Sequence, residues 1–74
     1  MTTKAGTIYR KTELVGTSNL GYADAIERAL KRARKTLRQL KWFEVRGQRG
    51  RISNGAIEYQ VELEVGFALE DTLA

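Results

Sequence analysis

The most regular pattern of apolar and polar residues lies near the C-terminal end of the chain. From residue 57 to residue 69 every second residue is apolar, and three of the six residues between them are glutamates. This period of two predicts a β-strand over residues 56–69 with one apolar and one polar face. Asn54-Gly55, directly before it, is the strongest short signal of a two-residue hairpin turn. We therefore expect a second, antiparallel strand over residues 42–52.

The middle of the chain has helical periodicity instead. Apolar residues recur at intervals of mainly four and three from Ile26 to Leu40, which predicts a helix over residues 22–40 with one apolar face. Gly21 is a permissible N-cap for this helix. Strand-forming residues predict a first strand over residues 7–15, followed by a break over residues 16–19. The predicted fold class is α+β, with the order β-α-β-β.

The predicted third strand is too long for its domain. Fourteen extended residues span about 45 Å, whereas a compact domain of this length is about 30 Å across. A single helix also covers only one face of a three-stranded sheet. A core this small needs a further source of stability, and the chain has no cysteine for a disulfide. These features predict association into an assembly.

The composition is that of one globular domain over residues 1–74, with 42% hydrophobic and 30% charged residues. Residues 1–6 and 71–74 are expected to be flexible ends. The absence of cysteine and histidine excludes thiolate nucleophiles, histidine acid–base chemistry and the usual zinc sites. No isolated pair of carboxylates suggests acid–base catalysis, so we expect neither an enzyme nor a metal site. The sequence shows no membrane span or signal peptide, which predicts a cytoplasmic protein.

The net charge of +4 is unevenly distributed. Residues 28–51 contain ten basic residues and one acid, whereas residues 52–74 contain five acids and no base. A basic middle is typical of a small nucleic-acid-binding module, which is the alternative function for this β-α-β-β topology. The other interpretation is that basic and acidic surfaces meet within or between subunits. Glutamates on the polar face of the third strand repel phosphate and favour the second interpretation.

Three residues are candidates for ligand binding. Trp42, the only tryptophan, lies between the predicted helix and second strand, either as a core residue or as a stacking platform for a flat ligand. Gln60 is the one uncharged polar residue among the glutamates, either facing solvent or offering a donor and an acceptor to an amide-like heterocycle. The two-residue turn places Arg49 opposite Gln60 and Arg51 opposite Glu58 as a cross-strand ion pair.

This register has two consequences for the candidate residues. Arg49 has no acid opposite it, and we expect it to be free for a ligand. Trp42 is placed on the sheet face opposite to that of Gln60. A β-bulge, for which Gly47 is the obvious host, would bring both to one face. Contributions from different subunits would also unite them.

Motifs along nearly the whole chain, over residues 8–70, together resemble the dodecin family. The combination is specific, although no single motif is. In chain order the motifs are Glu13-Leu14-Val15-Gly16-Thr17-Ser18, Asp24-Ala25-Ile26, Arg34-Lys35-Thr36-Leu37-Arg38, Trp42-Phe43-Glu44-Val45, Gln48-Arg49-Gly50, Tyr59-Gln60-Val61 and Val65-Gly66-Phe67.

The resemblance implies a fold, an assembly and a ligand. The fold is a β-α-β-β subunit whose antiparallel three-stranded sheet wraps around one helix, and the assembly is a hollow homododecamer. The ligand is flavin, as riboflavin or FMN, bound in stacked pairs between tryptophans for storage and photoprotection without turnover. In that family pattern Trp42 stacks on the flavin, Gln60 hydrogen-bonds its pyrimidine edge, and Arg49 adjoins it.

Some bacterial dodecins also hold coenzyme A, and the resemblance extends to this second ligand. Ala68 stands where bacterial members commonly have Arg or Lys after Val-Gly-Phe. This departure weakens the expectation of coenzyme A and of a phosphorylated flavin. The basic residues that best match the coenzyme A contacts are Arg10, Arg32 and Arg38.

Overall fold

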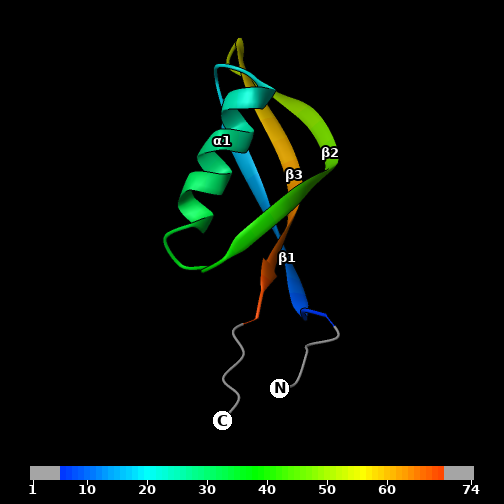
Figure 1. The fold of residues 1–74 in the computed structure, drawn as a ribbon. Coiled ribbons are helices and arrows are strands. Elements are labelled where there is room, and N and C mark those ends of the chain that lie inside the picture. The colour runs from blue at the N-terminus through cyan, green and yellow to red at the C-terminus, as the bar shows by residue number, and fades with distance from the viewer. Residues whose placement is uncertain (1–5, 70–74) are drawn as a thin grey trace, which may run out of the picture.

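One helix packs against a three-stranded antiparallel sheet in the structure, a computed structural model that describes residues 6–69 (Figure 1). The sheet has the order β1-β3-β2, with the third strand in the middle. This arrangement confirms the predicted α+β class and the order β-α-β-β. Apart from Gly6, the ends expected to be flexible lie outside the described residues. The elements are β1 (Tyr9–Ser18), α1 (Tyr22–Ala33), β2 (Leu40–Ser53) and β3 (Ala56–Ala68).

The first strand is longer than the sequence pattern predicts. It continues through Gly16 to Ser18, so the predicted break over residues 16–19 is wrong for its first three residues. A Cβ at Gly16 would overlap the carbonyl oxygen of Ala25 and lie 2.8 Å from the Cβ of Ala29. Glycine is needed here because the helix approaches the strand closely, and not because the chain turns.

The helix, by contrast, ends at Ala33, seven residues before its predicted end. Lys35 N–H and Thr36 N–H each donate to a carbonyl three residues earlier, at 3.1 Å, which tightens the last turn. The basic residues of this segment also lie three and four positions apart, where like charges destabilise a helix. Gln39, with a φ of 58°, then turns the chain into β2.

The start of the helix is held by the end of β1. Gly21 is the N-cap, as predicted, and its φ of 154° is a value that other residues rarely adopt. Ser18 Oγ donates to Asp24 Oδ2 at 2.6 Å and accepts from Leu20 N–H at 2.9 Å. These two hydrogen bonds connect the last residue of β1 to the first turn of α1 and to the loop before it.

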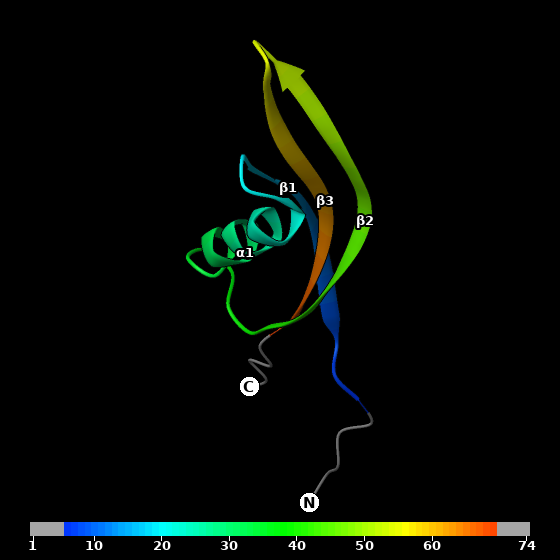
Figure 2. The ribbon, with the colours of Figure 1, turned by 90° about the horizontal axis from the view of Figure 1, so that it is seen from above.

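The core lies between α1 and the helix-facing side of β3. Val61, Leu63 and Val65 are fully buried, and Ala25 and Ala29 face them from the helix. The odd-numbered residues of β3 therefore form the apolar face, as the alternation predicts. The sheet curves with α1 on the inner side of its bend (Figure 2). We call the opposite side of the sheet the outer face.

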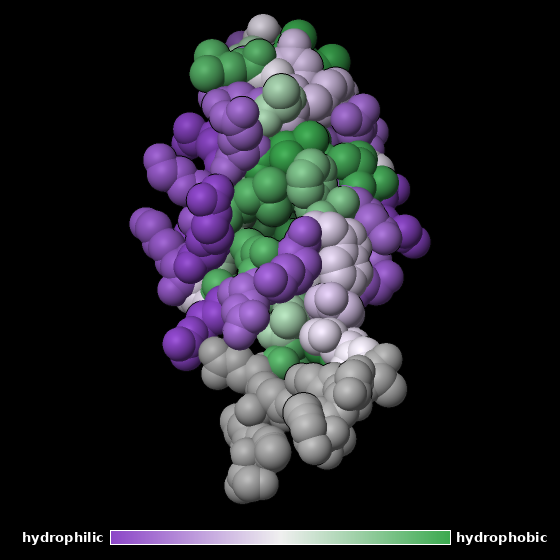
Figure 3. Space-filling model, viewed as in Figure 1, coloured by the Kyte–Doolittle hydropathy of each residue, from purple (hydrophilic) through white to green (hydrophobic). Residues whose placement is uncertain are grey.

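Apolar side chains also remain exposed on the helix-facing side. Phe43 and Val45 of β2 are 43% and 44% exposed, and apolar surface is visible between α1 and β2 (Figure 3). Beyond the helix, the β2–β3 hairpin carries Ile52 at 81% and Ile57 at 49% exposure. The longest principal extent is 62 Å, about twice the width of a compact domain of this length. Exposed apolar surface of this kind is typical of an interaction site.

Candidate ligand-binding site on the outer face of the sheet

A bulge in β2 places Trp42 on the outer face. From the hairpin turn to the pair Arg49–Gln60 the register is the one predicted from the sequence. Arg46 then has no partner on β3, because the register shifts by one residue between its two neighbours. A shift of one residue moves every later side chain to the other face of the strand. Trp42 consequently pairs with Gly66 and shares the outer face with Gln60.

The bulge lies directly beside Gly47, the host predicted from the sequence. A second shift follows between Leu40 and Trp42, where the chain enters the strand. The local backbone of β2, rather than its turn alone, therefore decides which face receives the indole.

Trp42 lies flat against the sheet backbone. A Cβ at Gly66 would fall within 2.5 Å of the indole carbons Cε2 and Cη2, so the ring occupies the space above this glycine. Tyr9 packs edge-on against the indole, with ring centroids 5.1 Å apart and an interplanar angle of 75°. Trp42 is still 37% exposed and is not part of the core of this protomer. Its position leaves aromatic surface available for a flat ligand.

Gln60 lies within a chain of polar contacts on the same face. Its Oε1 accepts from Arg49 Nε at 2.8 Å, and its Nε2 donates to Glu58 Oε1 at 3.0 Å. Arg51 Nη1 lies 3.9 Å from Glu58 Oε1, which confirms the expected cross-strand pair. No acid lies opposite Arg49, as predicted, but the expectation that Arg49 is free is wrong, because its Nη1 lies 3.5 Å from Glu62 Oε1. Glu62 lies two residues further along β3 than Gln60, the residue opposite Arg49, so the cross-strand pairing alone does not reveal this contact.

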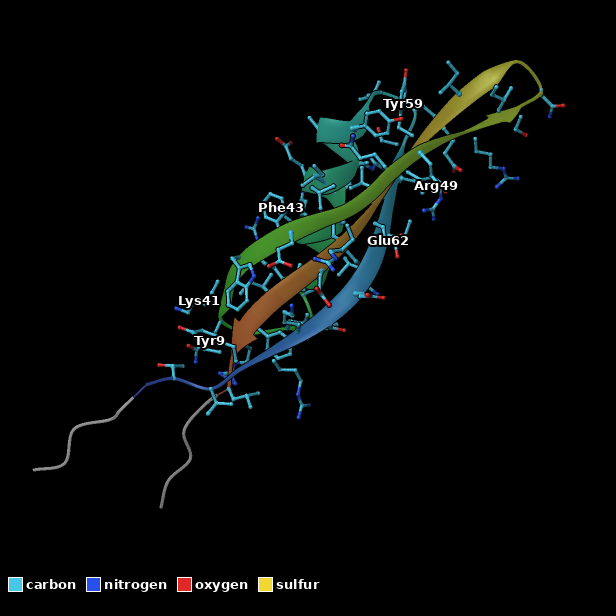
Figure 4. The ribbon with its side chains drawn as sticks, turned by 90° about the vertical axis from the view of Figure 1, so that its right-hand side faces the viewer. Tyr9, Lys41, Phe43, Arg49, Tyr59 and Glu62 are labelled. Carbon is cyan, nitrogen blue, oxygen red and sulfur yellow. The ribbon has the colours of Figure 1, made fainter. Side chains whose placement is uncertain are left out.

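The two candidate groups are far apart in one protomer. Gly66, beneath Trp42, and Gln60 are six residues apart on β3, which corresponds to about 20 Å in a strand. Tyr9 and Lys41 lie toward one end of the sheet, whereas Arg49 and Glu62 lie further along it (Figure 4). A single flat ring cannot reach both groups. A site containing both would need two copies of the chain.

Between these two groups the outer face carries a balanced charge network. Glu44 and Glu64 lie directly opposite each other on β2 and β3. Lys11 Nζ lies 3.2 Å from Glu64 Oε1, and Arg46 Nη1 lies 3.2 Å from Glu44 Oε1. The cations offset the repulsion of two facing carboxylates. Sequence reasoning missed this network, because the bulged Arg46 reaches it only after the register shift.

The three arginines matched to coenzyme A lie elsewhere. Arg10 pairs with Phe67 on the helix-facing side, Arg32 lies in the last turn of α1, and Arg38 lies in the following loop. The end of α1, this loop and the start of β1 lie toward the same end of the protomer (Figure 1). The exposed side of the helix there forms a shallow hollow of about 290 Å³, lined by Arg28, Lys31, Arg32 and Lys35.

Ala68 belongs to the outer face, not to the helix side. It pairs with Tyr9, the residue that packs against Trp42, and is 9% exposed. A side chain at position 68 therefore lies close to the indole. Residues 6–69 contain no group of three or more acidic, histidine or cysteine side chains that could hold a metal ion. No helix within this part of the chain is long and apolar enough to cross a membrane.

Comparisons with known proteins agree with this fold and these motifs. The model of the Dodecin family matches residues 8–70. A curated dodecin of Thermus thermophilus is 60% identical over 68 residues, which cover 90% of this chain and 99% of that protein. A Thermus thermophilus crystal structure, 60% identical, superimposes with a TM-score of 0.84 over 90% of this chain and 100% of the other. The structure of dodecin from Streptomyces coelicolor is 46% identical and superimposes with a TM-score of 0.85, covering 93% of this chain and 100% of the other.

Proposed function

The chain belongs to the dodecin family, and from that premise we propose that it binds flavin, as riboflavin or FMN, in a homododecamer. The bound flavin is held for storage and protected from light, without turnover. The site residues of this proposal are Trp42 as the stacking platform, Gln60 as the hydrogen-bonding partner and Arg49 as its neighbour.

The observation that carries this proposal is the position of Trp42. Its indole lies over Gly66 on the outer face, outside the core, and is 37% exposed. A flavin ring is flat and aromatic, so stacking on this surface removes apolar area of both rings from water. Close contact with an indole also quenches the excited state of a flavin. The same contact therefore supports binding and photoprotection.

Gln60 fits the polar edge of the same ligand. The pyrimidine edge of a flavin has an N–H flanked by two carbonyls, and a side-chain amide offers the complementary acceptor and donor. Arg49 Nε donates to the Gln60 oxygen at 2.8 Å, so the guanidinium lies beside any ligand at this amide. A flavin recognised in this way is oriented as well as held.

The assembly follows from the separation of these residues. Trp42 and Gln60 lie about 20 Å apart along the strand in one protomer, so a flavin that touches both must bind between different subunits. Exposed Ile52 and Ile57 on the projecting hairpin provide apolar surface for such contacts. In the proposed assembly of this protein, two flavins stack on each other between the Trp42 side chains of neighbouring subunits.

Coenzyme A is a second ligand that we propose for the helix side, not for the Trp42 site. The observation in its favour is the basic hollow on α1, which includes Arg32. Arg10 and Arg38 lie toward the same end of the protomer and would contribute positive charge for its phosphates. Isothermal titration of coenzyme A into wild-type protein and into Arg32→Ala tests this assignment, and equal affinity would contradict it.

Purification and titration test the flavin proposal. We expect the purified protein to be yellow and to release flavin on denaturation. In the flavin-free protein, added riboflavin should lose its fluorescence on binding. Trp42→Ala should weaken binding by roughly 2–3 kcal/mol, since ring area and stacking are lost together. Size-exclusion chromatography should show that its assembly remains intact.

Phe43→Ala is the matched control for this change. Phe43 is the adjacent aromatic residue of β2, with similar exposure, but it pairs with buried Val65 on the helix-facing side. Its loss should leave flavin affinity within about threefold of wild type in whatever fraction stays assembled. Equal affinity of Trp42→Ala and wild type would contradict the proposal, as would a wild-type protein that binds no flavin.

A further inference from the structure

The side-chain amide of Gln60 lies between an obligate donor and an obligate acceptor. A guanidinium can only donate, so the Gln60 atom 2.8 Å from Arg49 Nε must be the oxygen. A carboxylate can only accept, so the atom 3.0 Å from Glu58 Oε1 must be the nitrogen. Turning the amide by 180° would place donor against donor and acceptor against acceptor. These two neighbours therefore leave the amide only one favourable orientation.

Both neighbours are themselves anchored. Arg51 Nη1 lies 3.9 Å from the same oxygen of Glu58 that the amide contacts. Glu62 Oε1 lies 3.5 Å from Arg49 Nη1 on the other side. Arg49 and Glu62 lie along the middle of the sheet (Figure 4). Residues from β2 and β3 thus alternate in charge on both sides of the amide, and this alternation opposes its rotation.

The amide keeps unused capacity for a ligand. A glutamine side chain has two N–H groups and two oxygen lone pairs, and the contacts with Glu58 and Arg49 use one of each. One N–H and one lone pair remain, in a fixed order along the strand. They match a ligand edge that presents a carbonyl next to an N–H, as a lactam or an imide does.

We infer that Glu58 and Arg49 fix the orientation of the Gln60 amide and thereby select which of the two carbonyls of a flavin imide is recognised. The inference rests on the proposed flavin binding. An imide edge is nearly symmetric, with one carbonyl on each side of its N–H. A freely rotating amide would accept the ring in either direction, whereas a fixed amide accepts one. Glu58 is in this sense a positioning residue that acts on the ligand through Gln60.

Sulfur-substituted flavins test the selection directly. Replacing either the 2-carbonyl or the 4-carbonyl oxygen with sulfur weakens one acceptor and leaves the other intact. Wild-type protein should lose about tenfold in affinity for one of the two analogues, the value of one hydrogen bond, and little for the other. In Glu58→Gln the neighbour can donate as well as accept, so only Arg49 still favours one orientation, and the two losses should differ by no more than about threefold.

Glu13→Gln is the control for the change in charge. Glu13 lies on the outer face of β1, opposite Glu64 and away from the partner of Gln60, which is Thr17. This variant should keep the wild-type preference between the analogues. The inference is overturned if the wild-type protein loses the same affinity for both analogues, or if Glu58→Gln keeps the wild-type preference between them.

A measurement without ligand separates this inference from the proposed function. In ligand-free protein labelled with ¹⁵N-glutamine, the Gln60 side-chain amide protons should exchange with water more slowly than those of exposed Gln48. In Glu58→Gln the ratio between the exchange rates of Gln48 and Gln60 should fall at least threefold. A wild-type Gln60 amide that exchanges as fast as Gln48 overturns the inference. Slow exchange together with no flavin binding would instead support the fixed amide and refute the flavin proposal.

Discussion

Trp42 occupies the space that a side chain at position 66 would fill. Gly66 is its cross-strand partner on β3, and an added Cβ would overlap the six-membered ring of the indole. Tyr9 then packs against the ring from β1. The location of the aromatic platform thus depends on the missing side chain of a glycine rather than on a hydrogen bond. This relationship explains why a glycine, and not a larger residue, stands at position 66 on the outer face of β3.

Gly66→Ala should therefore reduce flavin binding without removing the tryptophan. The new methyl group must displace the indole, and overpacking of this kind costs about 1–3 kcal/mol. We expect flavin affinity to fall about tenfold or more in a fluorescence titration. Gly50→Ala is the control, because a Cβ there lies 3.8 Å from the nearest non-adjacent atom, Glu58 O, which is ordinary van der Waals contact. Wild-type affinity of Gly66→Ala would show that the indole moves aside at no cost.

Position 68 should influence the choice between flavins. Ala68 pairs with Tyr9, beside the indole, so a basic side chain here would lie near the phosphate of a stacked FMN. Ala68→Arg should raise the affinity for FMN about threefold or more relative to riboflavin, at low ionic strength, where Coulomb attraction is least screened. Paired titrations with both flavins measure this ratio. Equal changes for both ligands would show that the position does not recognise phosphate.

The projecting hairpin should be needed for assembly. Native mass spectrometry of wild type should show a dodecamer. Ile52 is 81% exposed, and Ile52→Glu would place a charge in any apolar contact between subunits, which is costly when the charge has no partner. We expect this variant to dissociate into smaller species at micromolar concentration.

Ser53→Glu provides the comparison for that experiment. It adds the same charge to the next residue of the hairpin, whose side chain points to the other face of the strand. If both variants assemble like wild type, the hairpin does not form the contact. If both dissociate equally, charge rather than the apolar side chain explains the loss.

The sequence predicts the register of the hairpin well but not its whole length. Asn54-Gly55 and the alternation of β3 place Arg49 opposite Gln60 correctly, because a two-residue turn fixes the pairs nearest to it. The face of Trp42 depends on whether Arg46 is an extra residue, and the turn does not determine this. Alternation in β2 is too weak to reveal it. Sequence reasoning could name the bulge as a condition but could not establish it.

The end of the helix is also not predictable from the sequence pattern alone. The apolar period continues to Leu37 and Leu40, but these residues belong to the loop and to β2. Their spacing is compatible with a helix, while the turn at Gln39 is imposed by the return of the chain to the sheet. Local pattern identified the element and its N-cap at Gly21, and tertiary structure determined where it ends.

Gly16 provides the last prediction, which concerns the contact between helix and sheet. A Cβ at this position would overlap the carbonyl oxygen of Ala25 and lie 2.8 Å from Ala29 Cβ, both on the buried side of α1. The backbone atoms of a helix cannot move aside as a flexible side chain does, so α1 as a whole must shift away from β1. Gly16→Ala should destabilise the protein by about 1–3 kcal/mol, the usual cost of overpacking a core. Chemical unfolding at a fixed subunit concentration measures this loss.

The control for Gly16→Ala is Gly47→Ala in β2. A Cβ at Gly47 meets Glu62 Oε1 at 3.5 Å, which is ordinary contact with the end of a flexible side chain. Both variants add one methyl group to a strand glycine and gain the same backbone entropy in the unfolded state. Their difference in unfolding free energy therefore isolates the helix contact. Because α1 and the outer face lie on opposite sides of the sheet, the assembled fraction of Gly16→Ala should still bind flavin. If Gly16→Ala were as stable as Gly47→Ala, the helix would have room to move away from the added methyl group.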